Sequence, residues 1–331
     1  MTSPIRSATT TDPVVPELPA LGTRVVVRYS LPAGYSHPVT DVIGTLEGTD
    51  PVAVRSADGR VVQIGRDTVV AVRALGPRPI RTSEIRALEV AAAQAWPGLE
   101  STWVDGWLAR YGSGITGRAN SATPLGMPGE LAPLTGDTLA RLDAWYAERG
   151  LPLRLLVPDR LSPGAPGWQP EEEPVVVLAA DLDLVPLPTS HTTTVLPEPD
   201  ASWLSLFDRR GADDDLRALL TATLGRGPRI GELAFVRIGD GPSPLAIARA
   251  AVTTAPDGRV WVGLQSVAVA PEHRRRGVGT LVCGEALRWG RERGATHAYL
   301  QVTEGNAAAR AMYSAMGFTE HHRYRYHRRV R

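Results

Sequence analysis

The chain has 331 residues, 43% of them hydrophobic, and a formal net charge of +1 at pH 7. This length is sufficient for about two or three globular domains, and the small net charge makes nucleic acid an unexpected partner. No run of about 18 apolar residues occurs, so we expect neither a membrane span nor a membrane partner. The single cysteine, Cys283, excludes an intramolecular disulfide and favours a reducing, cytoplasmic location.

The N-terminal quarter divides into a tail and a group of short strands. Residues 1–20 are rich in Thr, Pro and Ser, so we expect a disordered tail. Residues 21–75 are expected to form a small β-barrel, because they hold five short strand-like runs separated by Gly, Asp and Pro. The runs are Arg24–Tyr29, Val42–Leu46, Val52–Arg55, Val61–Ile64 and Val69–Val72, with a hairpin turn signal at Ala57–Arg60.

A second group of elements is predicted within residues 82–190. A helix capped by Thr82 or Ser83 runs to Ala95, and an amphipathic helix spans Thr135–Arg149. The predicted strands are Trp103–Tyr111 and Ile115–Ala122, paired as a hairpin around Gly112–Gly114, followed by Leu153–Val157 and Val175–Ala179.

Residues 193–331 form a third group. Trp203–Phe207 and Asp215–Leu224 are predicted to be helical. Glu320–Tyr326 alternates in polarity, and we expect it to be a solvent-exposed edge strand. Further strands are predicted at Leu233–Ile238, Leu245–Val252, Trp261–Ala270 and Thr296–Val302.

The segment Pro271–Thr280 joins a predicted strand to a predicted helix through three arginines and two glycines. The unpaired N–H groups at a helix N-terminus bind anions, and glycine at 277 and 279 lets the backbone approach a ligand closely. The segment therefore predicts a phosphate site. The helix beyond it has a buried stripe formed by Val278, Val282, Ala286 and Trp289.

A second short helix follows the strand at Thr296–Val302. Asn306 is a suitable N-cap, and Gly317 stands where a helix commonly ends. The residues Ala309, Met312, Tyr313 and Met316 follow the spacing of one helical face.

Together these two segments resemble the general control-related N-acetyltransferase (GNAT) superfamily. Its acetyl-CoA signature, Arg/Gln-x-x-Gly-x-Gly/Ala, matches Arg274, Gly277 and Gly279. Its later signature, Asn-x-x-Ala-x-x-x-Tyr-x-x-x-Gly-Phe, matches Asn306, Ala309, Tyr313, Gly317 and Phe318. The resemblance covers about residues 193–331, and it implies an α/β (α+β) fold with a mixed β-sheet flanked by helices.

The resemblance implies an enzyme that moves the acetyl group of acetyl-CoA to a primary amine of a small molecule or a protein, without a metal. Residues 82–190 resemble a degenerate GNAT-like half, because their strand–helix–strand order lacks the arginine–glycine turn. Residues 21–75 resemble the Src-homology or Tudor barrels that precede some actinobacterial acetyltransferases. The sequence leaves the acceptor open.

The resemblance also implies which residues hold acetyl-CoA. The backbone of Val267 and Val269 would pair with the pantetheine arm, which Asn306 would also reach. The N–H groups and arginines of the turn would bind the pyrophosphate. These turn residues are Arg274, Arg275, Arg276, Gly277, Val278, Gly279 and Thr280.

Tyr313 is the candidate general acid, because a phenol keeps its proton at neutral pH and can give it to the departing thiolate. Many relatives place a glutamate base where this chain has Gln265 and Ser266. We rank Glu304 first as a replacement, ahead of His297 and Glu232, with a water chain to solvent as the other route.

Two alternative functions remain. One is a tandem acetyltransferase like the mycothiol synthases, although the leading barrel is foreign to that group. The other is a non-catalytic protein that senses acyl-CoA and binds a partner through the barrel, which the missing glutamate favours.

Overall fold

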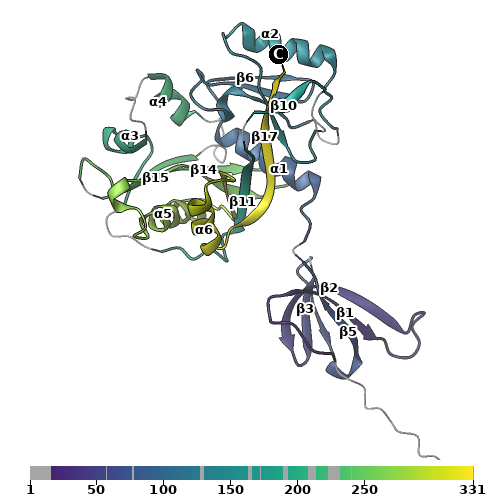
Figure 1. Ribbon diagram of the computed structural model, residues 1–331. Coiled ribbons are helices and arrows are strands. Elements are labelled where there is room, and N and C mark those ends of the chain that lie inside the picture. The colour runs from purple at the N-terminus through teal and green to yellow at the C-terminus, as the bar shows by residue number, and fades with distance from the viewer. Residues whose placement is uncertain are drawn as a thin grey trace, which may run out of the picture. The chain divides into compact units, whose positions relative to one another are not determined.

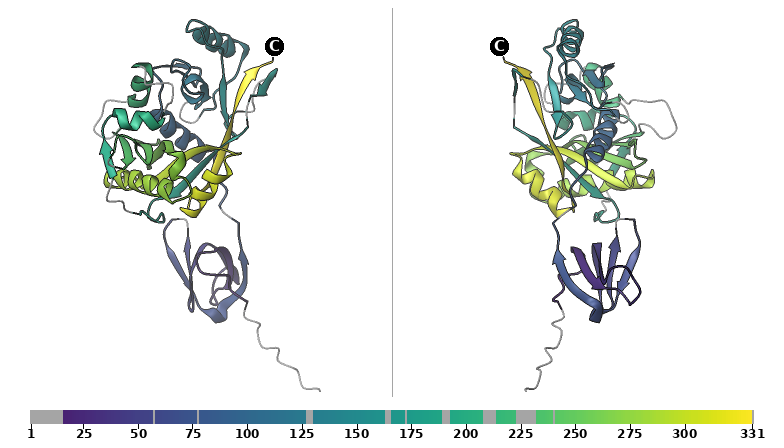
Figure 2. Two further views of the ribbon diagram at one scale, coloured as in Figure 1. Left: turned by 60° about the vertical axis from the view of Figure 1, so that its left-hand side comes forward. Right: turned by 90° about the vertical axis from the view of Figure 1, so that its right-hand side faces the viewer.

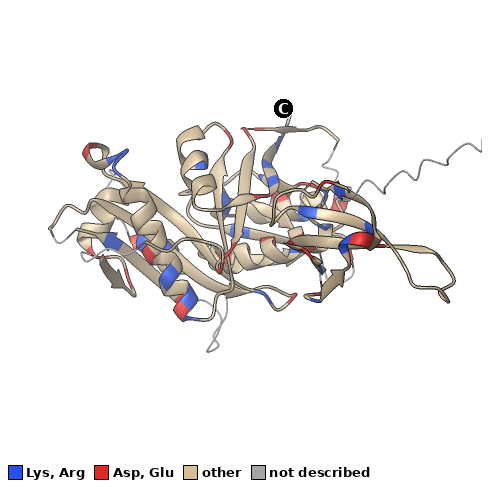
Figure 3. Ribbon diagram, turned by 90° about the horizontal axis from the view of Figure 1, so that it is seen from below, with Lys and Arg blue, Asp and Glu red and all other residues tan. Residues whose placement is uncertain are grey.

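The computed structural model describes residues 16–330 except 57, 77, 127–129, 163–165, 172, 189–192, 208–213, 223–231 and 240. The chain divides into two compact units, Met1–Pro79 and Ile80–Arg331 (Figure 1). None of the helices in these described ranges is long and apolar enough to cross a membrane. Acidic residues and arginines are interspersed along several elements (Figure 3).

The first unit is a five-stranded antiparallel sheet with the order β4-β3-β2-β1-β5. Its strands confirm all five runs expected from the sequence, and alternate residues such as Val25, Val27, Val52 and Val54 form its core. Ala57 of the predicted turn and most of the predicted tail lie outside the described residues. The strands are β1 Arg24–Ser30, β2 Val39–Thr49, β3 Val52–Ser56, β4 Val61–Ile64 and β5 Val69–Ala74.

The second unit is built on one twelve-stranded sheet with the order β12-β13-β14-β15-β16-β11-β17-β9-β8-β7-β6, and β10 also pairs with β17. Its first strands are β6 Glu100–Val104, β7 Trp107–Tyr111, β8 Ala122–Pro124, β9 Leu155–Pro158, β10 Trp168–Pro170 and β11 Val175–Asp181. The later strands are β12 Thr193–Leu196, β13 Glu232–Ile238, β14 Ala246–Thr254, β15 Val260–Val269, β16 His297–Thr303 and β17 Thr319–Arg329.

Helices cover both faces of this sheet (Figure 1 and Figure 2). Alternate residues of β16 explain the two layers, because Leu300 packs with side chains of α5 and α6 whereas Tyr299 packs with those of α1. The α3 and α4 helices pack against Phe235 and Ile247 on the second face. The helices are α1 Thr82–Ala95, α2 Gly136–Ala147, α3 Ala201–Phe207, α4 Asp214–Thr221, α5 Val278–Glu292 and α6 Ala307–Ala315.

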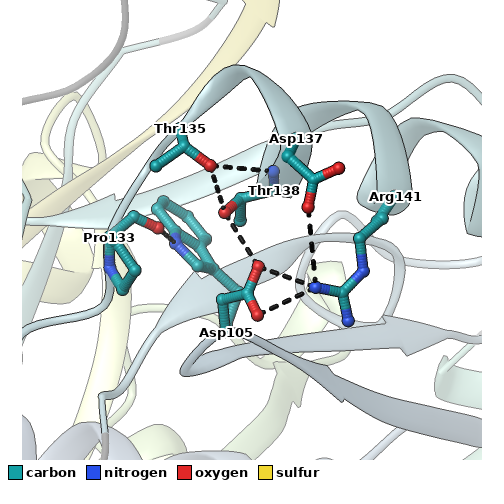
Figure 4. A network of polar contacts seen from close by, with 7 residues as sticks. Asp105, Pro133, Thr135, Asp137, Thr138 and Arg141 are labelled. Atoms are coloured by element: carbon teal, nitrogen blue, oxygen red, sulfur yellow. Dashed lines mark hydrogen bonds and ion pairs between the residues drawn. The ribbon is translucent and has the colours of Figure 1, made fainter.

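The predicted hairpin around Gly112–Gly114 is wrong. The β6 and β7 strands instead pair around Asp105 and Gly106, both of which have positive φ. This Asp-Gly pair suits the tight turn that matches strand twist. The carboxylate of Asp105 also accepts hydrogen bonds from Thr138 and Arg141 of α2, each at 2.9 Å (Figure 4), so the turn is tied to that helix.

The expectation of a solvent-exposed edge strand at Glu320–Tyr326 is also wrong. β17 lies inside the sheet, between β11 and β9, and pairs with both. Its alternate residues His322, Tyr324 and Tyr326 are buried. The charged residues between them are more exposed, and they are the residues that suggest an edge strand.

Two segments of the second unit share one order of elements. The run β6-β7-β8-α2-β9 has two antiparallel pairings, then a helix, then a strand parallel to the one before it. The run β13-β14-β15-α5-β16 repeats that order. The second run contains the glycine turn, and the site lies on it.

Candidate functional site

The β15 and β16 strands separate near their C-terminal ends. They pair in parallel from Trp261 with His297 to Leu264 with Leu300, and no pairing follows. At the same place the register of β15 against β14 shifts, and Ser266 has a φ of 52°. This bulge and the end of pairing leave backbone groups of β15 unmatched by its neighbour, which opens a cleft in the sheet.

A cavity of about 490 Å³ lies at this separation. Val267, Asn306 and Tyr313, all named from the sequence, line it. Asn306 and Tyr313 belong to α6 and its N-cap, which pack on the α5 face, whereas Trp96 and Phe207 come from the α1 and α3 side. The cavity therefore connects the two faces of the sheet through the gap between β15 and β16.

The glycine turn follows β15 and lies outside the lining of that cavity. Gly277 is the N-cap of α5 with a φ of 78°, and a Cβ built on it would meet nothing within 4 Å. Arg274, Arg275 and Arg276 are exposed, and the Nε of Arg274 donates to the carbonyl of Val269 at 3.2 Å. An αL glycine before a helix, open space and three exposed cations together suit an anionic ligand.

The remaining turn residues support the helix rather than face open space. Gly279 is buried, and a Cβ there would lie 2.9 Å from the sulfur of Met312 on α6. Val278 and Thr280 are half-buried, and Val278 packs against the core shared by α5 and α6. The second glycine of the motif thus allows the two helices to approach closely.

Tyr313 is buried, and its ring lies edge-on to that of Phe318 at 5.9 Å. Cys283 on α5 lies in the same core cluster as Tyr313. Burial raises the pKa of Tyr313 well above its usual value, with a smaller contribution from Cys283. The phenol therefore keeps its proton throughout the neutral range. Cys283 is itself fully buried, which raises its pKa to about 12 and makes it a core residue.

The helix-capping role expected of Asn306 is confirmed. The side-chain oxygen of Asn306 accepts a hydrogen bond from the N–H of Ala309 at 3.1 Å. Gly317 has a φ of 92°, as expected for a residue that ends a helix.

The three candidate bases lie elsewhere. Glu304 is paired with Arg323 at 2.5 Å, and Glu232 is paired with Arg293 at 2.6 Å. His297 contacts the hydroxyl of Thr296 at 2.8 Å, and burial lowers its pKa. None of the three is among the described residues that line the cavity.

The sequence analysis named Gln265 only as a residue in the place of the usual glutamate base, and it did not name Gln301 or Arg118. Gln265 and Gln301 come from β15 and β16, and Arg118 comes from a short helical turn, Arg118–Asn120. Gln265 is hydrogen-bonded to the buried Arg249, whose pKa burial lowers to about 9. A single arginine in a loop belongs to no motif, so the sequence gives no signal for Arg118. For the two glutamines, the alternation of residues along β15 and β16 is the available signal.

The separated parallel strands, the glycine turn and the α6 helix define an acetyltransferase of the GNAT type. The chain belongs to the family described as probable histone acetyltransferase Rv0428c C-terminal, which matches residues 82–327. The Sm-like N-terminal domain of the same family matches residues 19–73. The five-stranded first unit is thus Sm-like.

Individual relatives agree with this assignment. The probable histone acetyltransferase Rv0428c of Mycobacterium tuberculosis is 41% identical over 310 residues, which cover 93% of this chain and 95% of that protein. The uncharacterized N-acetyltransferase YobR of Bacillus subtilis is 27% identical over 253 residues, 72% of this chain and 97% of that protein. A GCN5-related N-acetyltransferase from Kribbella flavida shares the fold, with a TM-score of 0.50, 19% identity and coverage of 74% of this chain and 96% of that one.

Proposed function

We propose that this protein transfers the acetyl group of acetyl-CoA to a primary amine by direct attack of the amine on the thioester. One observation carries the proposal: Val267 of the bulged strand and Tyr313 of α6 line the same cavity at the gap between β15 and β16. An amine entering from one face of the sheet would there meet a thioester held on the other.

The residues present fit acetyl-CoA. The open, positively charged turn at 274–277 leads into the N-terminus of α5, which suits the pyrophosphate. The unpaired end of β15, with Val267 and Val269, offers main-chain groups to the pantetheine arm. Acetyl-CoA supplies the activated acetyl group.

Each protein group has one task in the transfer. As the amine nitrogen bonds to the carbonyl carbon, an N–H near Val267 donates to the carbonyl oxygen, where negative charge develops. When the carbon–sulfur bond breaks, the sulfur takes the hydroxyl proton of Tyr313. The phenol is protonated at neutral pH, and the tyrosinate left after the transfer regains a proton from water. Asn306 fixes the first turn of α6 and thereby the position of the phenol.

The proton of the attacking amine needs a separate route. The described lining of the cavity contains no carboxylate or imidazole, and Glu304 is held by Arg323. We therefore favour loss of this proton to water over transfer to Glu304. An amine that is already neutral requires no strong base.

We further propose that residues 82–190 are a degenerate GNAT-like half without a cofactor, that residues 193–331 form the catalytic half, and that the protein is cytoplasmic. The shared order of β6-β7-β8-α2-β9 and β13-β14-β15-α5-β16 supports the first point. Protein amines are included among the acceptors to be tested, because one relative is named as a probable histone acetyltransferase.

The glycine turn offers the test. We expect Gly277→Glu to weaken acetyl-CoA binding by at least about tenfold, because it sets a carboxylate at the N-terminus of α5 against a phosphate. Gly294→Glu is the matched control, since Gly294 also has a positive φ and open space but follows the C-terminus of α5. Both variants carry the same backbone strain.

Binding is measured by isothermal titration calorimetry and turnover by release of the free thiol with a panel of amines. Cys283 is buried and adds little background to a thiol reagent. Equal binding by wild type and Gly277→Glu would show that the cofactor site is misplaced. Tight binding without turnover of any amine would favour the acyl-CoA sensor.

A further inference from the structure

The cavity at the gap in the sheet holds an arginine that has no carboxylate partner in the described part of the chain. Arg118 lines the cavity, and its Nε is buried with no hydrogen-bond partner among the described residues. The phenols of Tyr324 and Tyr326 line the same cavity near it. A neutral hydroxyl leaves the charge of a guanidinium uncompensated, and a partly buried cation of this kind is costly without an anion.

The surroundings of Arg118 are also short of negative charge. Two further buried arginines, Arg110 and Arg249, lie near it and bond to carbonyl, hydroxyl and amide oxygens. The nearby buried carboxylate, Glu89, is paired with His322 at 2.8 Å. No aspartate or glutamate occurs in the lining that the structure describes. The cavity therefore carries a positive field on the side away from Tyr313.

A second polar atom in the same cavity lacks a partner. The Oε1 of Gln301, on β16, is buried and accepts no hydrogen bond from any described residue. A buried oxygen without a hydrogen bond is unfavourable, so a ligand that donates to it would stabilise the site, as an anion would stabilise the guanidinium. Trp96, Phe207 and Tyr326 contribute aromatic surface between these polar groups.

We infer that the acceptor is an amine that also carries a carboxylate, as a free α-amino acid with an apolar or aromatic side chain does. The inference rests on the proposed acetyl transfer and names its substrate class. The carboxylate pairs with Arg118, an N–H of the acceptor is donated to Gln301, and the side chain lies against the aromatic wall. A guanidinium fork binds a carboxylate through two parallel bonds, which fixes the direction of the amine.

The same features disfavour a lysine side chain as the acceptor. A protein lysine brings a cation on an apolar stem, and the carboxylate that would attract it is absent from the described lining. Burying that stem beside Arg118 would leave the guanidinium unpaired. An enzyme built to pair a substrate charge rejects the analogue that lacks it more strongly than it rejects a change of size.

The test compares free amino acids with their primary amides. L-phenylalanine, L-leucine and L-methionine are each paired with the corresponding amide, which keeps the amine and side chain and removes the charge. We expect kcat/KM to favour the acid at least about tenfold in wild type. In Arg118→Met that preference should disappear through a raised KM for the acids, while kcat/KM for the amides changes by less than about threefold.

Three controls keep the outcome interpretable. Acetyl-CoA affinity, measured separately, reports whether the Arg118→Met variant is folded. Arg118→Lys retains the charge without the fork and should restore part of the preference. Arg141→Met removes an exposed arginine of α2, which is paired with Asp105 at 2.9 Å, and should leave the preference intact.

If no amine is turned over, the proposed function fails but the inference is still tested by binding. N-acetyl-L-phenylalanine and its primary amide are titrated into the complex with coenzyme A, and the acid should bind at least about tenfold tighter. Equal binding of the two probes, an acid preference that survives in Arg118→Met, or faster acetylation of lysine peptides than of every free amino acid would each overturn the inference.

Discussion

Replacement of Tyr313 by phenylalanine removes one hydroxyl group and keeps the ring in place. The ring is buried against Phe318, so the shape of the α6 face is preserved. Removal of this one hydroxyl group is expected to change the free energy of unfolding by no more than about 1 kcal/mol. Loss of a general acid lowers kcat by about 10²–10⁴-fold, equivalent to about 2.7–5.4 kcal/mol of activation free energy. The catalytic effect thus exceeds the structural one.

The assay for Tyr313→Phe is steady-state thiol release with a saturating amine, combined with urea unfolding. Tyr146→Phe is the control, because Tyr146 is also buried and its hydroxyl donates to the carbonyl of Arg110 at 3.0 Å. It lies outside the described cavity lining, so it should lose stability without losing rate. If Tyr313→Phe keeps kcat within about threefold of wild type while binding acetyl-CoA normally, Tyr313 is not the acid.

Two further predictions concern proton transfer and pH. Glu304→Gln should change kcat/KM by less than about threefold, since Glu304 is held by Arg323; a loss of about 100-fold with a flattened acid limb of the pH profile would make it the base. His321 is neutral in the folded state, because burial and then His322 lower its pKa to about 3. Unfolded histidine binds a proton below about pH 6.5, so stability falls on acidification from there toward pH 3. His321→Gln should flatten that dependence in urea titrations at graded pH, and an unchanged slope would contradict it.

Local signals in the sequence were sufficient for most individual elements. The cap at Asn306 and the terminating residue Gly317 stand where the sequence predicts them, whereas the predicted cap at Thr82 or Ser83 is wrong, because Arg81 is the N-cap of α1 and Thr82 already lies in the helix. Each depends on backbone conformation or on a bond three residues away, which a short window contains. The same is true of the glycine turn, because its geometry is set within one strand–helix connection.

Contacts between distant segments were not predictable in the same way. The arginines and histidines of β17 suggest a solvated strand, but β9 and β11, about 140 or more residues earlier, pair with its two edges, and α1 packs against its buried side chains. The hairpin at Asp105 was misplaced because a glycine-rich loop and an Asp-Gly pair both predict turns. Arg118 lines the cavity together with Gln301 only because folding brings its loop beside β16.

The topology explains why the acceptor side of the site has no sequence motif. β11, from the first half of the unit, lies between β16 and β17 of the second half and pairs with both. Neither half therefore forms a complete sheet alone, and residues of both halves line the cavity at the gap. In the proposed function the cofactor would be bound mainly by the main chain of one continuous segment, so few side chains would suffice to mark it. The acceptor side depends on side chains from separate loops, such as Arg118, and on strand residues such as Gln301. Single substitutions on the acceptor side can then change substrate specificity without weakening acetyl-CoA binding. Arg118→Met should therefore alter the preference among acceptors and leave the affinity for acetyl-CoA unchanged.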